Sequence, residues 1–248
     1  MVVVMPNNRE TMMDMIELGE KIIGILGGMG PEATADLFYR IIRATPVERD
    51  QDHIHVIIDS NSKVPDRTPA ILGTGASPIP VLVETGKRLE KAGADFLIVP
   101  CNTAHYFLPE VQKELGIPIL HMINLSSAYI AMKYPDVRKA GLLASDGTVT
   151  SKLYHDSYAK HGIEIVTPSE SSQRDVMDAI YKYIKTGDLE TGGELLHRVS
   201  LKLIEAGSDS VLCGCTEVSL VLHDGDLSVP VVDPLQVLAE EAVKQALA

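Results

Sequence analysis

The chain has 248 residues, of which 45% are hydrophobic, and it contains no tryptophan and only three phenylalanines, which predicts a globular protein with a mostly aliphatic core. Its formal net charge of −12 argues against a nucleic-acid-binding or membrane-binding surface, but not against an acidic small-molecule substrate. Three cysteines are an odd and sparse set for a disulfide scaffold and favour a cytoplasmic protein, and no apolar run is long enough to span a membrane.

Short apolar segments that predict strands alternate along the chain with amphipathic segments that predict helices. Residues 1–19 lack the basic segment that opens a signal peptide, and we interpret them as an N-terminal extension. The alternation is typical of α/β proteins, in which helices cover both faces of a mostly parallel sheet. We expect strands at 22–26, 55–59, 96–100, 118–122, 140–144, 163–167, 210–214 and 229–233, and helices at 32–45, 80–92, 175–187 and 193–207.

The chain contains an internal repeat. LEKAGADFLIVPCNT aligns with LIEAGSDSVLCGCTE in one register, which matches Cys101 with Cys215 at a separation of 114 positions. KIIGILGGMG at 21–30 similarly resembles KAGLLASDG at 139–147. Two such matches in the same order indicate an internal duplication, and therefore two similar domains related by pseudo-twofold symmetry.

The duplication predicts where the domains divide and where a ligand binds. We expect residues 20–118 together with 227–248 to form a first α/β domain that carries Cys101, and residues 119–226 to form a second that carries Cys215. Ligands of open parallel sheets bind beyond the C-terminal ends of the strands, and each cysteine follows a predicted strand at that end. Pseudo-twofold symmetry would therefore place the two thiols on opposite sides of one cleft.

Two equivalent thiols across a cleft suit racemisation, in which one group removes a proton from a carbon and its partner delivers one to the other face. A thiol has a pKa of about 8.5, which the N-terminus of a helix can lower. Each cysteine precedes a sequence that favours the start of a helix, with Asn102, Thr103 and Thr216 as expected N-cap residues. The same helix N-termini would offer backbone N–H groups to a substrate carboxylate.

The segments GILGGMGPEAT, VPDRT, PCNTAH, LLASDGT and GCTE together resemble the cofactor-independent aspartate/glutamate racemase family, and this resemblance covers residues 20–248. It implies two α/β domains, a homodimer, a dicarboxylic amino acid as the substrate and catalysis by paired cysteines without pyridoxal phosphate or any other cofactor.

The resemblance also implies roles for single residues. Cys101 and Cys215 would be the two bases, and Arg67 and Lys185 would contact the side-chain carboxylate of the substrate. From the residues alone, Arg67 could equally be a solvated arginine, and Lys185 could interact with a helix end. The remaining residues expected to bind substrate are Met29, Asn102, Thr103, Thr148, Thr216 and Glu217.

Two departures from the family pattern favour aspartate as the substrate. GGMGP stands where glutamate racemases typically carry an Asp-Ser-Gly loop, and Cys101 stands where some broad-specificity racemases have threonine. Racemisation of glutamate or of several amino acids is the alternative within the enzyme class. A non-catalytic protein that binds small dicarboxylates is the alternative outside it.

Cys213 and His105 raise the question of a metal site, but their spacing does not favour one. Cys213 aligns with Val99 in the repeat, which marks it as a core position. Structural zinc sites use Cys-x-x-Cys pairs, whereas CGC lies in a predicted strand. His105 is expected either to tune Cys101 or to be an ordinary hydrogen-bonded histidine. GGMG lacks the full dinucleotide fingerprint, and no Walker lysine follows it.

Overall fold

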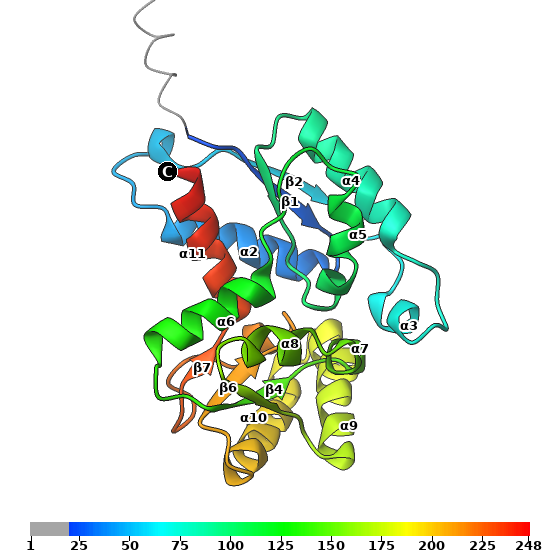
Figure 1. Ribbon diagram of the computed structural model, residues 1–248, viewed down its shortest axis with the longest axis vertical. Coiled ribbons are helices and arrows are strands. Elements are labelled where there is room, and N and C mark those ends of the chain that lie inside the picture. Colours follow the sequence, from blue (N-terminus) through cyan, green and yellow to red (C-terminus); the bar gives the residue numbers. More distant parts are fainter. Residues whose placement is uncertain (1–19) are drawn as a thin grey trace, which may run out of the picture.

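The structure is a computed structural model that describes residues 20–248, so the expected extension at 1–19 lies outside the described residues. It contains two α/β domains, each built on one parallel sheet (Figure 1). The first domain comprises β1 (Ile23–Gly27), α2 (Pro31–Ala44), η1 (Asp50–Asp52), β2 (Val56–Ser60), α3 (Arg67–Ile71), α4 (Ile79–Lys91), β3 (Phe96–Ile98), η2 (Thr103–Tyr106), α5 (Leu108–Gln112) and, after the second domain, α11 (Pro234–Ala246).

The sheet of the first domain has the strand order β2-β1-β3, with all strands parallel. Every residue of the central strand β1 is buried because helices cover both faces of the sheet. Ile25 packs in the core that includes Leu37 of α2 and Leu238 of α11. Leu26 points to the opposite face and packs in the core that includes Leu82 of α4.

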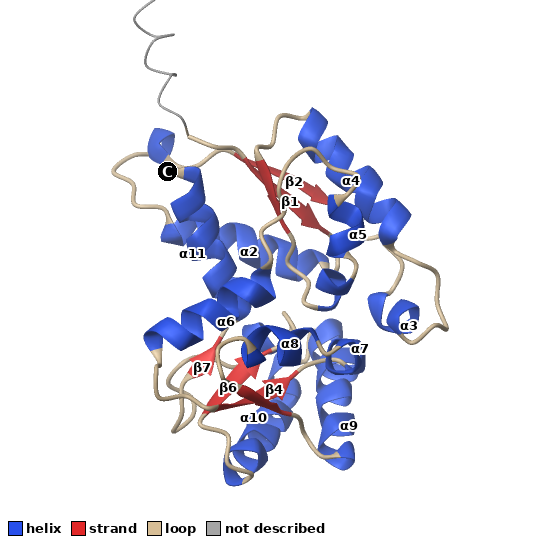
Figure 2. Ribbon diagram, in the orientation of Figure 1, coloured by secondary structure: helices blue, strands red, loops and turns tan. Residues whose placement is uncertain are grey.

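The second domain comprises β4 (Lys139–Leu143), α7 (Asp146–Ser151), α8 (Leu153–Ala159), β5 (Glu164–Val166), α9 (Glu170–Asp178), the π-helical turn η3 (Ala179–Tyr183), η4 (Ile184–Thr186), α10 (Leu189–Glu205), β6 (Ser210–Cys213), η5 (Val218–Leu220) and β7 (Val231–Val232). Its parallel sheet has the order β5-β4-β6-β7. Leu143 packs in the core that includes α9 and α10, and Leu142 in the core that includes α8. Figure 2 shows these helices around the second sheet. The expected α/β class with parallel sheets flanked by helices is confirmed.

The two halves repeat their local hydrogen bonds as well as their strand order. Gly93 and Gly207 end corresponding helices with φ angles of 101° and 95°, a region that glycine enters without strain. The aspartate two residues later accepts a backbone N–H bond from the segment at the start of its own half, at 2.7 Å in the first half and 3.0 Å in the second. The expected duplication is therefore visible in the backbone geometry.

The expected return to the first domain at residue 227 is wrong for the segment that contains β7. β7 pairs with β6 in the second sheet, and the N–H of Val211 donates to the carbonyl of Pro230 at 2.9 Å. The equivalent bond in the first half joins Leu97 to the carbonyl of Pro118 at 2.8 Å, and a bridge to Ile119 follows it. Each half thus keeps its own last strand, and the chain returns to the first domain only at α11.

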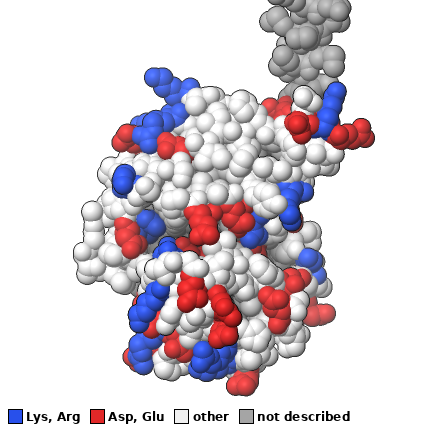
Figure 3. Space-filling view, turned by 180° about the vertical axis from the view of Figure 1, so that it is seen from behind, with Lys and Arg blue, Asp and Glu red and all other residues white. Residues whose placement is uncertain are grey.

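Helix α6 (Met122–Lys133) connects the domains and packs against α11 of the first and α8 of the second. Within residues 20–248, no helix is long and apolar enough to cross a membrane. Acidic and basic side chains are interspersed on the face of the molecule that Figure 3 presents.

Candidate active site

Cys101 and Cys215 line the same small cavity between the two domains. The first thiol follows β3 and the second follows β6, so both lie beyond the C-terminal strand ends, where ligands of parallel sheets bind. Nine of the ten residues expected from the sequence line this cavity. The other seven are Met29, Arg67, Asn102, Thr103, Lys185, Thr216 and Glu217.

Arg67 lies beside Cys101 at the start of α3. Burial acts to lower the pKa of Arg67, but the neighbouring side chains of Cys101 and Asp66 outweigh it and raise that pKa. The guanidinium also donates to backbone carbonyls, including that of Met29 at 3.4 Å, while its buried Nε has no partner in the described part of the chain. Arg67 is therefore placed to pair with a thiolate or with an anionic ligand.

The expected helix caps after the cysteines are wrong. Asn102 and Glu217 precede 3₁₀ turns of four and three residues, and neither caps its turn through its side chain. The next helix begins at Leu108, and Pro109, its second residue, has no N–H to continue a helical ladder from the 3₁₀ turn. Because such short turns align few peptide dipoles, charged neighbours and not helix N-termini set the electrostatics of the two thiols.

His105 does not contact the thiol of Cys101. Its Nδ1 lies 2.8 Å from the backbone oxygen of Cys101, and its Nε2 accepts the N–H of Met122 at 3.1 Å. These bonds assign the Nδ1–H tautomer and occupy both ring nitrogens, so His105 cannot ligate a metal. Burial, with a smaller contribution from His121, lowers the pKa of His105 to about 3, and the ring is neutral at physiological pH.

Two hydrogen-bond clusters join the domains behind Cys101. The Asn102 side-chain oxygen accepts from the hydroxyl of Tyr154, in the second domain, at 2.6 Å. The Thr103 hydroxyl lies 2.9 Å from that of Thr148 and 3.1 Å from that of Ser145. Thr148 is fully buried and does not line the cavity, so the structure places it behind Thr103 and not at the expected substrate-contact position.

Cys215 has a different neighbour from Cys101. Its Sγ donates to Oε2 of Glu217 at 2.8 Å, and the other carboxylate oxygen binds Nζ of Lys185 at 2.5 Å. Burial and the Glu217 carboxylate raise the pKa of Cys215 well above its usual value. Burial acts to raise the pKa of Glu217, but Lys185 and the thiol donor outweigh it and lower that pKa. The carboxylate is thus ionised, and the thiol is protonated.

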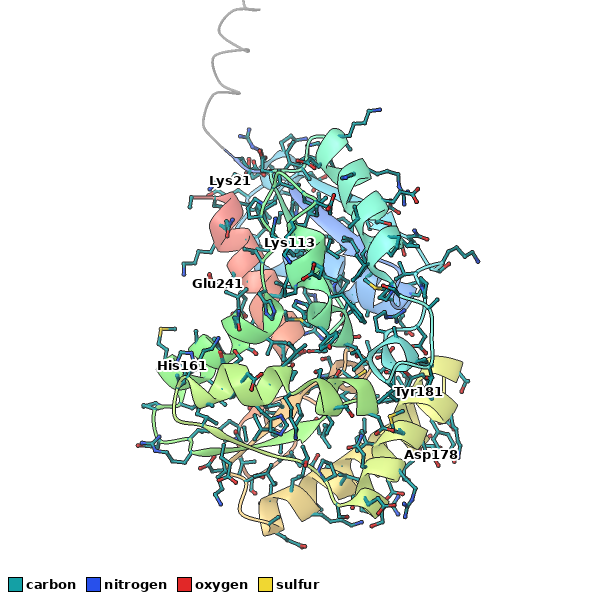
Figure 4. All side chains as sticks on the ribbon, turned by 45° about the vertical axis from the view of Figure 1, so that its right-hand side comes forward. Lys21, Lys113, His161, Asp178, Tyr181 and Glu241 are labelled. Carbon is teal, nitrogen blue, oxygen red and sulfur yellow. The ribbon has the colours of Figure 1, made fainter. Side chains whose placement is uncertain are left out.

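Four cavity residues escaped the sequence analysis: Asp66, Thr68, Ser145 and Tyr181. Three of them lie in motifs that carry the family resemblance, two beside Arg67 in VPDRT and one in LLASDGT, so these motifs could have identified them. No sequence motif indicated Tyr181. It lies on the π-helical turn η3, and the wider turn places its side chain where the periodicity of an α-helix does not predict it. Figure 4 shows it where η3 approaches the segment around α3, and Lys185 lies 5.4 Å from its ring centroid.

Cys213 is packed in the core of the second domain, as its alignment with Val99 predicts. Its side chain is 0% exposed, and its only hydrogen bond in the described chain is a long one of 3.7 Å to the carbonyl of Leu222. Cys213 and Cys215 therefore differ in environment although one glycine separates them. The site combines one thiol beside a guanidinium, one beside a carboxylate, and donors for an anionic ligand, a set suited to moving protons at a carbon acid.

Comparison with known proteins places these motifs among racemases. Residues 26–242 match the family described as Asp/Glu/Hydantoin racemase. Over 237 residues the chain is 27% identical to the broad specificity amino-acid racemase RacX of Bacillus subtilis, covering 92% of this chain and 99% of that protein.

Solved structures agree with the family match. The aspartate racemase of Picrophilus torridus superposes with a TM-score of 0.80 at 31% identity, covering 91% of this chain and 94% of that one. An aspartate racemase homologue from Pyrococcus horikoshii OT3 has a TM-score of 0.76 at 28% identity and covers 92% and 100% of the two chains.

Proposed function

The chain belongs to the Asp/Glu/hydantoin racemase family, and we propose that it interconverts L- and D-aspartate without a cofactor, with Cys101 and Cys215 as the two catalytic residues. The observation that carries the proposal is the meeting of both thiols in one interdomain cavity, each delivered by a different half of a duplicated fold. A single-base enzyme would have no need for the second thiol at the matched position.

In the proposed reaction, the thiolate of one cysteine removes the Cα proton while the thiol of the other delivers a proton to the opposite face. The reverse reaction exchanges the two roles. The thiolate of Cys101 would pair with Arg67, and the thiol of Cys215 is held by Glu217 at 2.8 Å. The bond from the Cys215 thiol to Glu217 supports Cys215 as the acid in this direction, which leaves the role of base to Cys101.

The Cα–H bond of an amino acid is a weak acid, so the site must stabilise the negative charge that develops in the transition state. Arg67 offers a buried Nε without a partner in the described residues, and Lys185 offers an ammonium shared with Glu217. These two cations, one from each domain, support a substrate that carries two carboxylates. The hydroxyls of Thr103 and Thr216 and the amide of Asn102 add neutral polar groups to the lining of the same cavity.

The cavity in this conformation measures about 20 Å³, enough for about one water molecule. An amino acid needs more room, so we expect the domains to separate when the substrate enters and to close around it. The contacts Tyr154 to Asn102 and Thr103 to Thr148 cross between the domains and would close the site again. Closure would exclude water and strengthen the charge interactions at the carbanion.

Incubation of the reduced protein with L-aspartate in D₂O tests the proposal. We expect D-aspartate to appear with deuterium at Cα, measured by chiral chromatography and mass spectrometry. A protein that binds aspartate without deuterium exchange or D-isomer would be a dicarboxylate-binding protein, and the proposal would be wrong. Parallel incubations with L-glutamate and neutral amino acids test the broad specificity named for the Bacillus relative.

A further inference from the structure

The two thiols of the proposed reaction end each turnover in the opposite protonation state. If Cys101 removes the proton and Cys215 delivers one, the protein is left with a Cys101 thiol and a Cys215 thiolate. Before the same reaction can start again, a proton must reach Cys215 and another must leave Cys101. The structure contains a feature that serves this reset at Cys215.

Glu217 connects Cys215 to a second cavity. One carboxylate oxygen accepts the Cys215 thiol, and the other binds Lys185. The same Glu217 and Lys185 also line a separate cavity of about 230 Å³, whose other walls are residues Gly30–Ala33 at the start of α2 and Leu220. Glu32 and Pro31 on its wall are exposed, so this second cavity is open to solvent. Glu217 therefore lines both the cavity that holds the Cys215 thiol and a cavity that is open to solvent.

The repeat shows that only the second half has a carboxylate at this position. Thr103 occupies the position that matches Glu217, two residues after the corresponding cysteine. Its hydroxyl bonds to Ser145 and Thr148 and not to the thiol of Cys101. Each half also contributes one cation, Arg67 or Lys185, to the cavity. The two halves therefore differ in which carboxylate meets the thiol: Glu217 accepts the thiol of Cys215, whereas Asp66 in the first half lines the cavity and accepts the N–H of Thr68.

We propose that Glu217 is the proton relay of Cys215: it holds the thiol protonated at rest and, after each turnover, returns the proton through the second cavity, which opens to solvent. This inference rests on the proposed two-thiol racemisation. In the return step, an O–H bond of water breaks and its proton forms an O–H bond on the Glu217 carboxylate; that bond then breaks as the proton forms the S–H bond of Cys215. The proton that Cys101 releases combines with the hydroxide left in water, so the reset takes up no net proton and needs no oxidant or reductant.

The first part of the proposal, that Glu217 keeps the Cys215 thiol protonated, can be tested without an assay of racemisation. We compare the rate of iodoacetamide alkylation at Cys215 in the wild type and in Glu217→Gln by peptide mass spectrometry at about pH 8, where thiolate formation limits reactivity. Loss of the neighbouring carboxylate should favour the thiolate and speed alkylation of Cys215 about tenfold, the change that one pKa unit produces. Glu32→Gln, on the wall of the same second cavity, is the matched control and should leave the rate unchanged. Equal rates in wild type and Glu217→Gln would overturn the proposal even if the protein proves not to racemise aspartate.

The relay step is tested by kinetics. The reset occurs in the free enzyme, so Glu217→Gln should lower kcat about tenfold or more while kcat/KM falls much less. A variant that had merely lost affinity for the substrate would not show this difference between the two parameters. Formate, small enough for the second cavity, should restore kcat of Glu217→Ala in proportion to its concentration and leave Glu32→Gln unaffected. An equal loss in kcat and kcat/KM without rescue by formate would mean that Glu217 binds substrate or supports the fold and does not carry the proton.

Discussion

Replacing each cysteine with alanine separates packing from catalysis, and Cys213 is the informative position. Cys213→Ala removes one buried sulfur atom with a single long hydrogen bond. The loss is similar in size to a buried Ile→Val change, which costs about 0.5–1.5 kcal/mol. For a chain of this size, about 1 kcal/mol lowers the melting temperature by roughly 2–4 °C. We expect this shift by differential scanning calorimetry, with racemisation at a rate close to that of the wild type.

Cys101→Ala and Cys215→Ala should show the opposite pattern. Each removes a proposed proton-transfer group, and such groups contribute about 10²–10⁴-fold to a rate. Chiral chromatography of the product should therefore find racemisation close to background in both variants. Cys215 is partly exposed, so Cys215→Ala should leave the melting temperature near that of the wild type, whereas Cys101 is buried and Cys101→Ala should lower it about as much as Cys213→Ala does. If Cys213→Ala lost as much activity as the other two, the division between core and catalytic thiols would be refuted.

Four other results are expected. Burial holds the pKa of His105 near 3 against an ordinary 6.5, so the stability that this neutral ring contributes is complete above about pH 6.5 and is lost as the pH falls towards 3; urea denaturation across this range should show the decline, and His105→Gln should flatten it. Arg67→Lys should reduce kcat/KM for aspartate by about tenfold or more, because lysine cannot reproduce the two-point contact of a guanidinium. Tyr154→Phe, which leaves Asn102 without its partner across the domains, should destabilise the protein by about 1–3 kcal/mol in denaturant titration. Light scattering should find the homodimer that the family resemblance implies; a monomer at working concentrations would contradict it.

The positions of the two cavity thiols could be predicted from the sequence because two strong signals coincide there. Each cysteine follows a short, mostly apolar segment that forms a buried parallel strand, and the repeat aligns the two in one register. Parallel strands end at the same edge of a sheet, so their C-terminal residues must meet near the ligand site. Arg67 and Lys185 entered only through family resemblance, since a loop arginine and a lysine near a helix end have ordinary explanations.

The features that the sequence analysis predicted wrongly or missed depend on contacts between distant residues, or on a backbone conformation that local propensity does not favour. Asn102 and Thr216 have good capping side chains, but the helices they would cap are shortened to 3₁₀ turns. The pairing of β7 with β6 depends on strand register and not on composition. The Lys185–Glu217 pair joins residues 32 positions apart and depends on the position of the turn after α9. No periodicity in the sequence encodes that contact.

The asymmetry between the two thiols is compatible with a reaction whose products are mirror images. L- and D-aspartate have equal free energies in water, so the two values of kcat/KM must be equal whatever the enzyme does. Glu217 beside Cys215 and Arg67 beside Cys101 therefore cannot bias the final mixture. In the proposed reaction, Glu217 would keep Cys215 protonated in the free protein, and the two directions would then differ in kcat and in KM. The duplication would supply two equivalent proton-transfer groups, and the Thr103-to-Glu217 difference would give the free protein one defined state from which to begin.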